Sequence, residues 1–147
     1  MLFRSVYENG CDYEIGKANT VREGKDVTII ANGLMVGVAL DAATALAENG
    51  VSARVLDMHT VKPIDEEAIV AAAKETGKIV VAEEHLAAGG LGSTVAMVVS
   101  RTVPVPMEFV NVGDTYAESG DAQGLLNKYG LTADEIVAAV GRVSDRG

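Results

Sequence analysis

Cysteine and aromatic residues are scarce in this sequence. Its 147 residues include one cysteine, Cys11, no tryptophan, and only 4% aromatic residues in total. One cysteine excludes an intrachain disulfide, and with only two histidines beside it the ligands for a structural zinc site are lacking. A core with few aromatic side chains must be built from Val, Ile, Leu and Ala. Such a core suits helices packed closely on a sheet better than an aromatic-rich β-sandwich.

Basic residues and long apolar stretches are also lacking. Lys and Arg total 12 against 21 Asp and Glu, which gives a net charge of −9. Nucleic acids and anionic membranes bind clustered Lys and Arg, so neither is expected as a partner. No apolar stretch reaches the ~20 residues of a membrane span, and the first residues do not resemble a secretory signal. We therefore expect a cytoplasmic protein.

Apolar β-branched runs alternate with helical patterns along the chain. This alternation predicts an α/β domain with a mainly parallel sheet, and the length corresponds to a single domain. Residues 1–18 show no long period and are interpreted as a lead-in to a domain at residues 19–147. Expected strands cover residues 19–22, 27–31, 53–58, 79–82 and 107–112, and expected helices cover about 34–49, 65–76, 90–102, 122–129 and 132–143.

Two local signals refine this pattern. The connection between the strands at 19–22 and 27–31 is too short for a parallel return, which needs a dozen or more residues. We therefore expect these two strands to pair antiparallel, with the first at a sheet edge. Asp65 is expected to cap the helix that follows it, and Thr132 with Glu135 forms a predicted capping box at the start of the last helix.

The stretch from residue 78 to residue 100 combines an apolar strand, an acidic pair with a histidine, a small-residue loop and an uncharged apolar run. In a parallel α/β sheet such a loop lies at the carboxyl end of its strand, where these folds usually place function. No charge occurs between His85 and Arg101. A helix that starts near Gly90 is therefore expected to be buried on more than one side.

The acidic pair and its histidine are candidates for acid–base chemistry. A histidine titrates near neutral pH and a carboxylate can orient it, so Glu83, Glu84 and His85 could act together. No nucleophile or metal partner is apparent beside them, and the interpretation we favour is that they anchor the loop. His59 follows Asp57 at the end of another expected strand, where a hydrogen-bonding role is favoured over catalysis.

The glycines of this loop invite a test for dinucleotide binding. Residues 90–92 read Gly-Leu-Gly, whereas a dinucleotide fingerprint follows the first strand of its unit and is completed by an acid ~20 residues further on. Here the glycines follow a late strand, and the acids nearest that spacing, Glu108 and Asp114, do not clearly end the next strand. The favoured alternative is that the glycines let the helix approach a neighbour closely.

Several motifs together resemble the C-terminal domain of transketolase and its thiamine-diphosphate relatives, over roughly residues 13 to 143. The Glu-Glu-His segment with its glycines is shared with related synthases and keto-acid dehydrogenase β subunits. The last motif is similar to transketolase in particular, especially the short split form of bacteria and archaea. The stretches that carry the resemblance are YEIGKA at 13–18, VREGKDVTII at 21–30, HTVKPID at 59–65, VVAEEH at 80–85, GGLG at 89–92, and GDTYAESG at 113–120 running into KYGLT at 128–132.

The resemblance implies a three-layer α/β/α sandwich whose five strands are four parallel and one antiparallel at the edge. It implies that residues 1–18 are the tail of a middle domain and that residues 19–147 are the C-terminal domain. In such enzymes thiamine diphosphate and Mg²⁺ sit on an N-terminal domain, and the activating carboxylate comes from the middle domain. The complete enzyme transfers a two-carbon ketol unit between sugar phosphates, as in the pentose phosphate pathway.

By this resemblance the chain is expected to supply no catalytic, cofactor-binding or metal-binding residue and to be inactive alone. Its expected role is assembly of a homodimer with the N-terminal and middle domains or subunit of the same enzyme. The candidate interface loop consists of Glu84, His85, Gly89, Gly90 and Gly92. Two alternatives stay open at this point: a free-standing nucleotide-binding or regulatory Rossmann-like module, and a module that docks another protein.

Overall fold

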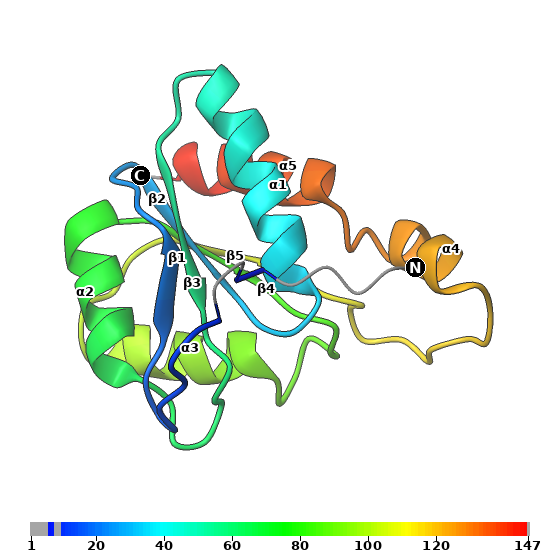
Figure 1. Cartoon of the computed structure of the whole chain (residues 1–147), viewed down its shortest axis with the longest axis horizontal. Coiled ribbons are helices and arrows are strands. Elements are labelled where there is room, and N and C mark those ends of the chain that lie inside the picture. The colour runs from blue at the N-terminus through cyan, green and yellow to red at the C-terminus, as the bar shows by residue number, and fades with distance from the viewer. Residues whose placement is uncertain (1–5, 8–9, 147) are drawn as a thin grey trace.

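A computed structural model describes residues 6–7 and 10–146 of the chain. One five-stranded sheet, in the order β1-β3-β2-β4-β5, is covered by helices on both faces (Figure 1). The three-layer α/β/α fold is therefore confirmed. The strands are β1 Asn19–Arg22, β2 Val27–Ala31, β3 Ala53–Asp57, β4 Ile79–Ala82 and β5 Met107–Val110, and the helices are α1 Met35–Glu48, α2 Glu66–Thr76, α3 Leu91–Arg101, α4 Ala122–Lys128 and α5 Ala133–Ser144.

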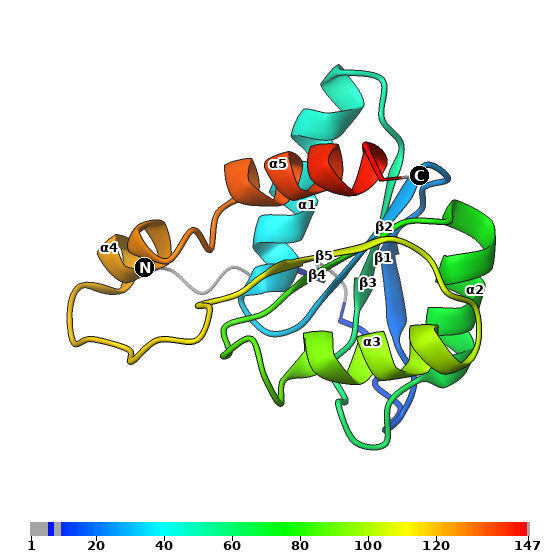
Figure 2. The ribbon, with the colours of Figure 1, turned by 180° about the vertical axis from the view of Figure 1, so that it is seen from behind.

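Side chains of β2 alternate between two hydrophobic cores. Val27, Ile29 and Ala31 pack with residues of α1 and α5, whereas Ile30 packs with residues of α2 and α3. Figures 1 and 2 show α1 and α5 on one face of the sheet and α2 and α3 on the other. All five residues of β2 are buried, as expected for the central strand of a parallel sheet covered on both faces.

The pairing expected for β1 was wrong in its partner and right in its direction. β1 is an antiparallel edge strand, but it pairs with β3 and not with β2. The turn after β1 crosses the beginning of β3, where the amides of Lys25 and Asp26 both donate to the carbonyl of Ser52. A Cβ on Gly24 would lie 2.2 Å from the carbonyl carbon of Ala53. This close crossing places β2 between β3 and β4, both of which it pairs with in parallel.

The helix ends follow the expected signals with one difference. The Asp65 carboxylate accepts a hydrogen bond from the amide of Ala68 (Oδ1···N 3.0 Å), which confirms the predicted cap of α2. Thr132 caps α5 through the amide of Glu135 (Oγ1···N 3.3 Å). The Glu135 carboxylate does not complete a capping box but accepts from Arg142 (Oε1···Nη2 2.8 Å). Glu135 thus forms an ion pair with Arg142, about two turns further along α5, in place of the expected hydrogen bond to the backbone amide of Thr132.

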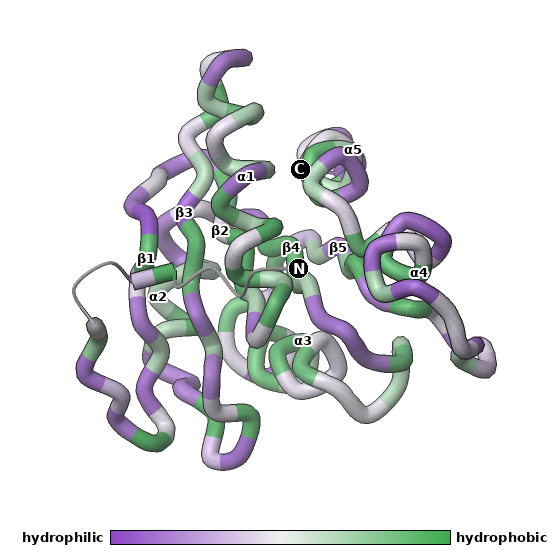
Figure 3. The backbone as a smooth tube through the Cα atoms, turned by 45° about the vertical axis from the view of Figure 1, so that its right-hand side comes forward, coloured by the Kyte–Doolittle hydropathy of each residue, from purple (hydrophilic) through white to green (hydrophobic). Residues whose placement is uncertain are grey.

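Only one face of α3 is covered by the described residues. Leu91, Val95 and Val98 are buried against the sheet, whereas Met97 on the opposite side is 62% exposed. Figure 3 draws this helix largely in green and pale tones, and its exposed residues are Met97, Ser100 and Arg101. The expectation of burial on more than one side is thus not met within this part of the chain. A second cover for α3 stays a prediction about a partner.

The segment before β1 lies against the carboxyl end of β3 and the start of α2. The Tyr7 hydroxyl donates to the carboxylate of Asp57 (Oη···Oδ2 2.9 Å), and the Ala18 amide donates to Asp65 (N···Oδ2 2.8 Å). Burial, and next the hydrogen bond to Asp57, raise the pKa of Tyr7. A domain boundary at residue 18 stays a prediction, and part of the expected lead-in, residues 1–5 and 8–9, lies outside the described residues.

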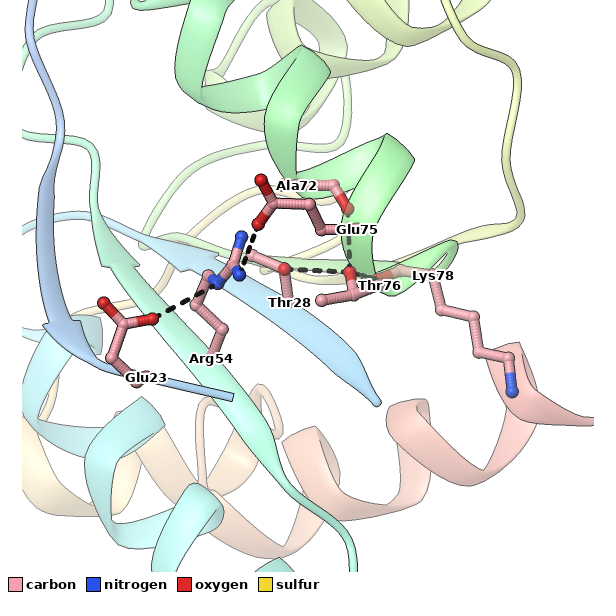
Figure 4. A network of polar contacts seen from close by, with 7 residues as sticks. All are labelled: Glu23, Thr28, Arg54, Ala72, Glu75, Thr76 and Lys78. Carbon is pink, nitrogen blue, oxygen red and sulfur yellow. Dashed lines mark hydrogen bonds and ion pairs between the residues drawn. The ribbon is translucent and has the colours of Figure 1, made fainter. Parts of the chain in front are cut away.

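A polar network joins α2 to the amino ends of the central strands (Figure 4). The buried hydroxyls of Thr28 and Thr76 lie 2.9 Å apart, and Thr76 also donates to the carbonyl of Ala72 in α2. Nearby, Arg54 pairs with Glu75 (Nη2···Oε2 2.6 Å). The network fixes the end of α2 over the sheet.

In the described part of the chain no helix is long and apolar enough to cross a membrane.

Thr76→Val is expected to lower the free energy of unfolding by about 1–3 kcal/mol, because it leaves the fully buried hydroxyl of Thr28 without its partner. The double variant Thr28→Val/Thr76→Val should lose less than the sum of the single variants, since both partners are then removed. Urea denaturation followed by circular dichroism measures both. Thr20→Val, at an exposed edge position, serves as the control, and additive losses would contradict the proposed pairing.

Candidate functional site

The candidate loop begins with Glu83, directly after β4, and ends where α3 starts. Glu83 is only 3% exposed, and its carboxylate accepts hydrogen bonds from the amides of Leu91 (Oε2···N 2.6 Å) and Gly92 (Oε1···N 2.7 Å). These are the first two amides of α3, which has no side-chain cap of its own at Gly90. The negative charge also lies at the positive end of the helix dipole. Glu83 therefore joins β4 to the start of α3.

The glycines of the loop are required by this arrangement. A Cβ on Gly90 would lie 2.3 Å from Oε2 of Glu83, and a Cβ on Gly92 would lie 2.8 Å from Cδ1 of Phe109 in β5. Gly89 has a φ of +86°, in the left-handed region that favours glycine. Close approach, the interpretation favoured from the sequence, is confirmed for Gly90 and Gly92.

The same contacts argue against a dinucleotide at this loop. A dinucleotide fold binds the pyrophosphate at the free amides and positive dipole of the helix that follows the glycine loop. In this chain those amides already bind the carboxylate of Glu83, whose negative charge would repel a phosphate. The glycines make room for the carboxylate of Glu83 at the position where a nucleotide-binding loop would hold the phosphate of its ligand.

Glu84 and His85 follow this buried carboxylate in sequence but do not share its burial. Both residues are exposed, and Glu84 forms no hydrogen bond or ion pair within residues 6–7 and 10–146. The loop backbone stays paired with the segment after β5, since the amide of Val112 donates to the carbonyl of His85 (N···O 3.1 Å). The structure therefore separates Glu83 from its two neighbours and assembles no acid–base group from the three. Their role in an interface stays a prediction.

Asp57 and His59 do not pair with each other. Asp57 accepts from Tyr7, whereas Nδ1 of His59 lies 2.9 Å from the hydroxyl of Thr60. Nε2 of His59 is buried without a hydrogen-bond partner among the described residues, and the ring of Tyr13 packs edge-on against the imidazole at 4.7 Å between centroids. The two residues therefore hold the lead-in segment against the end of β3, in agreement with a hydrogen-bonding and packing role for this pair of positions.

A groove that the sequence did not reveal lies beside the loop, between its residues 84–86, the turn at 113–120 and α4. Its volume is about 480 Å³. Lys128 of α4 pairs with Glu118 of the turn (Nζ···Oε2 2.6 Å), which holds one wall of the groove in place. The lining is mostly apolar and contains no Lys or Arg; it consists of Leu34, Glu84, His85, Leu86, Val112, Ala117, Glu118, Ala122, Leu125, Leu126, Tyr129 and Leu131.

The groove brings together Leu34, residues 84–86 and residues from 112 to 131, which are distant in sequence, so local patterns do not reveal it. The missed role of Glu83 did have a signal: an acid ends the strand, and the following helix begins with glycine where Ser, Thr, Asp or Asn would usually cap it. A metal site was not expected, and the described residues contain no group of three or more His, Cys, Asp or Glu able to hold a metal ion.

Comparisons with known proteins identify relatives over most of the chain. The model of the family described as transketolase, C-terminal domain, matches residues 16–136. The chain is similar to the 6-deoxy-6-sulfo-D-fructose transketolase subunit SqwH of Clostridium sp. (strain MSTE9), with 48% identity over 92% of this chain and 42% of that protein. It is also 45% identical to a subunit of the apulose-4-phosphate transketolase of Phocaeicola vulgatus, over 89% of this chain and 42% of the relative.

Two further comparisons extend this result. A 1-deoxy-D-xylulose-5-phosphate synthase of Heliobacterium modesticaldum is 39% identical over 89% of this chain and 20% of its own length. A solved structure titled "Split gene transketolase, inactive beta4 tetramer" superposes with a TM-score of 0.91 and 48% identity, over 95% of this chain and 46% of that one. The chain thus spans less than half the length of each of these relatives.

Glu83→Gln is expected to lower the free energy of unfolding by about 1.5–3 kcal/mol, because an amide group replaces one of the two acceptor oxygens that face the α3 amides. Thermal and urea denaturation measure the loss. Glu84→Gln, one residue along and fully outside this contact, should stay within about 0.5 kcal/mol of the parent chain. Equal stability of the two variants would contradict the capping role.

Gly90→Ala is expected to destabilise the fold by about 1–3 kcal/mol, since its Cβ would overlap the Glu83 carboxylate and force it off the helix amides. Gly37→Ala is the matched control. Gly37 lies inside α1, and a Cβ added there would meet no neighbouring atom within 4 Å, so this change should stabilise by about 0.5–1 kcal/mol. A Gly90→Ala chain as stable as the parent would exclude the close contact.

Proposed function

Because this chain belongs to the transketolase C-terminal domain family, we propose that it serves the assembly of a split transketolase-like enzyme and does not carry out the chemistry itself. The observation that carries this proposal is the position of Glu83. The Glu-Glu-His motif is the one most suggestive of catalysis, but its first carboxylate, that of Glu83, already accepts hydrogen bonds from the first two amides of α3. What remains of the motif, Glu84 and His85, is exposed and available to a neighbouring chain.

The residues of this chain do not fit the cofactor that the family implies. The amides at the start of α3 are occupied by Glu83, the groove beside the loop lacks Lys and Arg, and no metal-binding group is found among the residues that the structure describes. We assign thiamine diphosphate and Mg²⁺ to the remainder of the enzyme. In this proposal the N-terminal and middle domains reside on the partner polypeptide or elsewhere in the same enzyme.

The proposed reaction of the complete enzyme is transfer of a two-carbon ketol unit between sugars, usually sugar phosphates. The relatives of this chain are named for different sugars, a sulfofructose and apulose 4-phosphate, and for a xylulose-phosphate synthase. Because one C-terminal domain accompanies such different substrates, the choice of sugar is assigned to the other domains. We further propose that two copies of the assembled enzyme form a dimer, with the exposed face of α3 around Met97 available for contact.

A free-standing nucleotide-binding module is the rival proposal, and the site geometry counts against it. Its phosphate would compete with the carboxylate of Glu83 for the amides of Leu91 and Gly92. A thermal-shift screen with NAD, ATP and thiamine diphosphate distinguishes the two proposals. A rise of several degrees with a nucleotide would favour the rival, whereas an unchanged melting temperature with all three favours the assembly role.

The isolated chain is expected to fold without binding thiamine diphosphate and without turning over sugar phosphates. Isothermal titration with thiamine diphosphate and Mg²⁺ should give no heat of binding, and a coupled transketolase assay should give no activity. Addition of the remainder of the enzyme from the same organism, with both the N-terminal and the middle domain, should restore turnover. Micromolar binding of the cofactor by this chain alone would contradict the proposal.

A further inference from the structure

The groove between α4 and the candidate loop combines an apolar floor with an acidic rim. Leu86 is 41% exposed at its edge, and Leu125 of α4 and Tyr129, the residue after α4, are partly exposed along it. The ring of Tyr129 is fixed because its hydroxyl accepts a hydrogen bond from the amide of Glu118 (Oη···N 3.1 Å). The groove is therefore a preformed apolar surface with its walls already tied together.

The charges around the groove decide which molecules it can accept. Its acidic lining residues are Glu84 and Glu118. Glu118 is already paired with Lys128, whereas Glu84 is exposed and unpaired within the described residues. A phosphate or carboxylate ligand would meet an unpaired carboxylate and no Lys or Arg in the lining. A cationic group placed beside Glu84 would instead gain a partner.

We propose that this groove docks a segment of the partner polypeptide that presents apolar side chains flanked by Lys or Arg. The apolar side chains would cover Leu86 and Leu125, and the basic group would pair with Glu84. This inference rests on the proposed function, since the partner is the part of the enzyme that carries the N-terminal and middle domains. It adds the surface that makes the contact and the chemistry of the segment that fits it.

A second copy of this chain is a poorer occupant than a basic segment of a different polypeptide. Each copy carries a net charge of −9, so two copies repel at long range, and an acidic rim would face a predominantly acidic surface. A small sugar phosphate fits no better, because its anionic group finds no Lys or Arg in the lining. Charge complementarity thus selects a basic partner segment among the three.

The test measures binding of this chain to the thiamine-diphosphate-carrying polypeptide of the same organism by isothermal titration. Glu84→Lys reverses the charge of an exposed rim residue and is expected to weaken binding about 10-fold or more. Leu86→Ser, which removes an exposed apolar side chain from the edge, should weaken it several-fold. Glu48→Lys is the matched control, because Glu48 is an exposed acid at the far end of α1, on the order of 20 Å from the end of α1 that borders the groove.

Salt dependence supplies a readout that a folding defect would not reproduce. Binding of the parent chain should weaken as NaCl rises from low to high concentration, and the Glu84→Lys chain should lose part of this dependence. If parent, Glu84→Lys, Leu86→Ser and Glu48→Lys chains all bind equally, the groove proposal is overturned while the assembly role stands. If the parent chain does not bind the partner at all, the assembly role fails, and the groove proposal fails with it.

Sedimentation velocity of this chain alone tests the competing occupant. The proposal predicts that groove variants leave the sedimentation coefficient unchanged in the absence of the partner polypeptide. A self-associated species that dissociates in Glu84→Lys and Leu86→Ser but persists in Glu48→Lys would assign the groove to a second copy and overturn the proposal. Displacement of the partner from the parent chain by a sugar phosphate would also overturn the groove proposal.

Discussion

The contact between the Glu83 carboxylate and the first amides of α3 is the interaction on which the rest of the site depends. It joins the carboxyl end of β4 to the start of the next helix with two short hydrogen bonds, of 2.6 and 2.7 Å. Because the carboxylate must lie this close to the backbone, Gly90 and Gly92 cannot carry a side chain without displacing it or Phe109. The chain from Glu84 to Gly89 is then pushed outward, where its side chains are exposed.

The same contact explains how a loop with an acidic pair, a histidine and several glycines can be structural. The buried carboxylate of Glu83 accepts two hydrogen bonds from backbone amides and thereby holds the start of α3. Its negative charge also neutralises the positive end of the α3 dipole, which would otherwise attract a phosphate. The resemblance of this loop to those of transketolase-like enzymes is thus compatible with a role in assembly. This chain spans less than half the length of these relatives, so in each of them its fold is one part of a longer polypeptide.

The outward loop and α4 extend this role to a surface. The turn at 113–120 is held to α4 by the pair of Glu118 and Lys128 and by the hydroxyl of Tyr129, so side-chain contacts connect the short segments that form the groove. In Figures 1 and 2 this region projects beside the main α/β body. The groove has an apolar floor and, at its edge, an acid that is unpaired among the described residues, whereas the buried Thr28, Thr76 and Glu83 of the interior all have hydrogen-bond partners.

The sequence by itself determined the elements, the capping of α2 at Asp65 and the glycine loop, because β-branched runs, helix caps and tight turns depend on neighbouring residues. The tertiary structure decided what depends on residues far apart. It chose β3 as the partner of β1, since the turn at Gly24 crosses the start of β3 before the chain enters the centre of the sheet. It also assigned Glu83 to the start of α3 and assembled the groove. Strand order and carboxylate position are set by long-range packing and hydrogen bonding, which local sequence patterns do not encode.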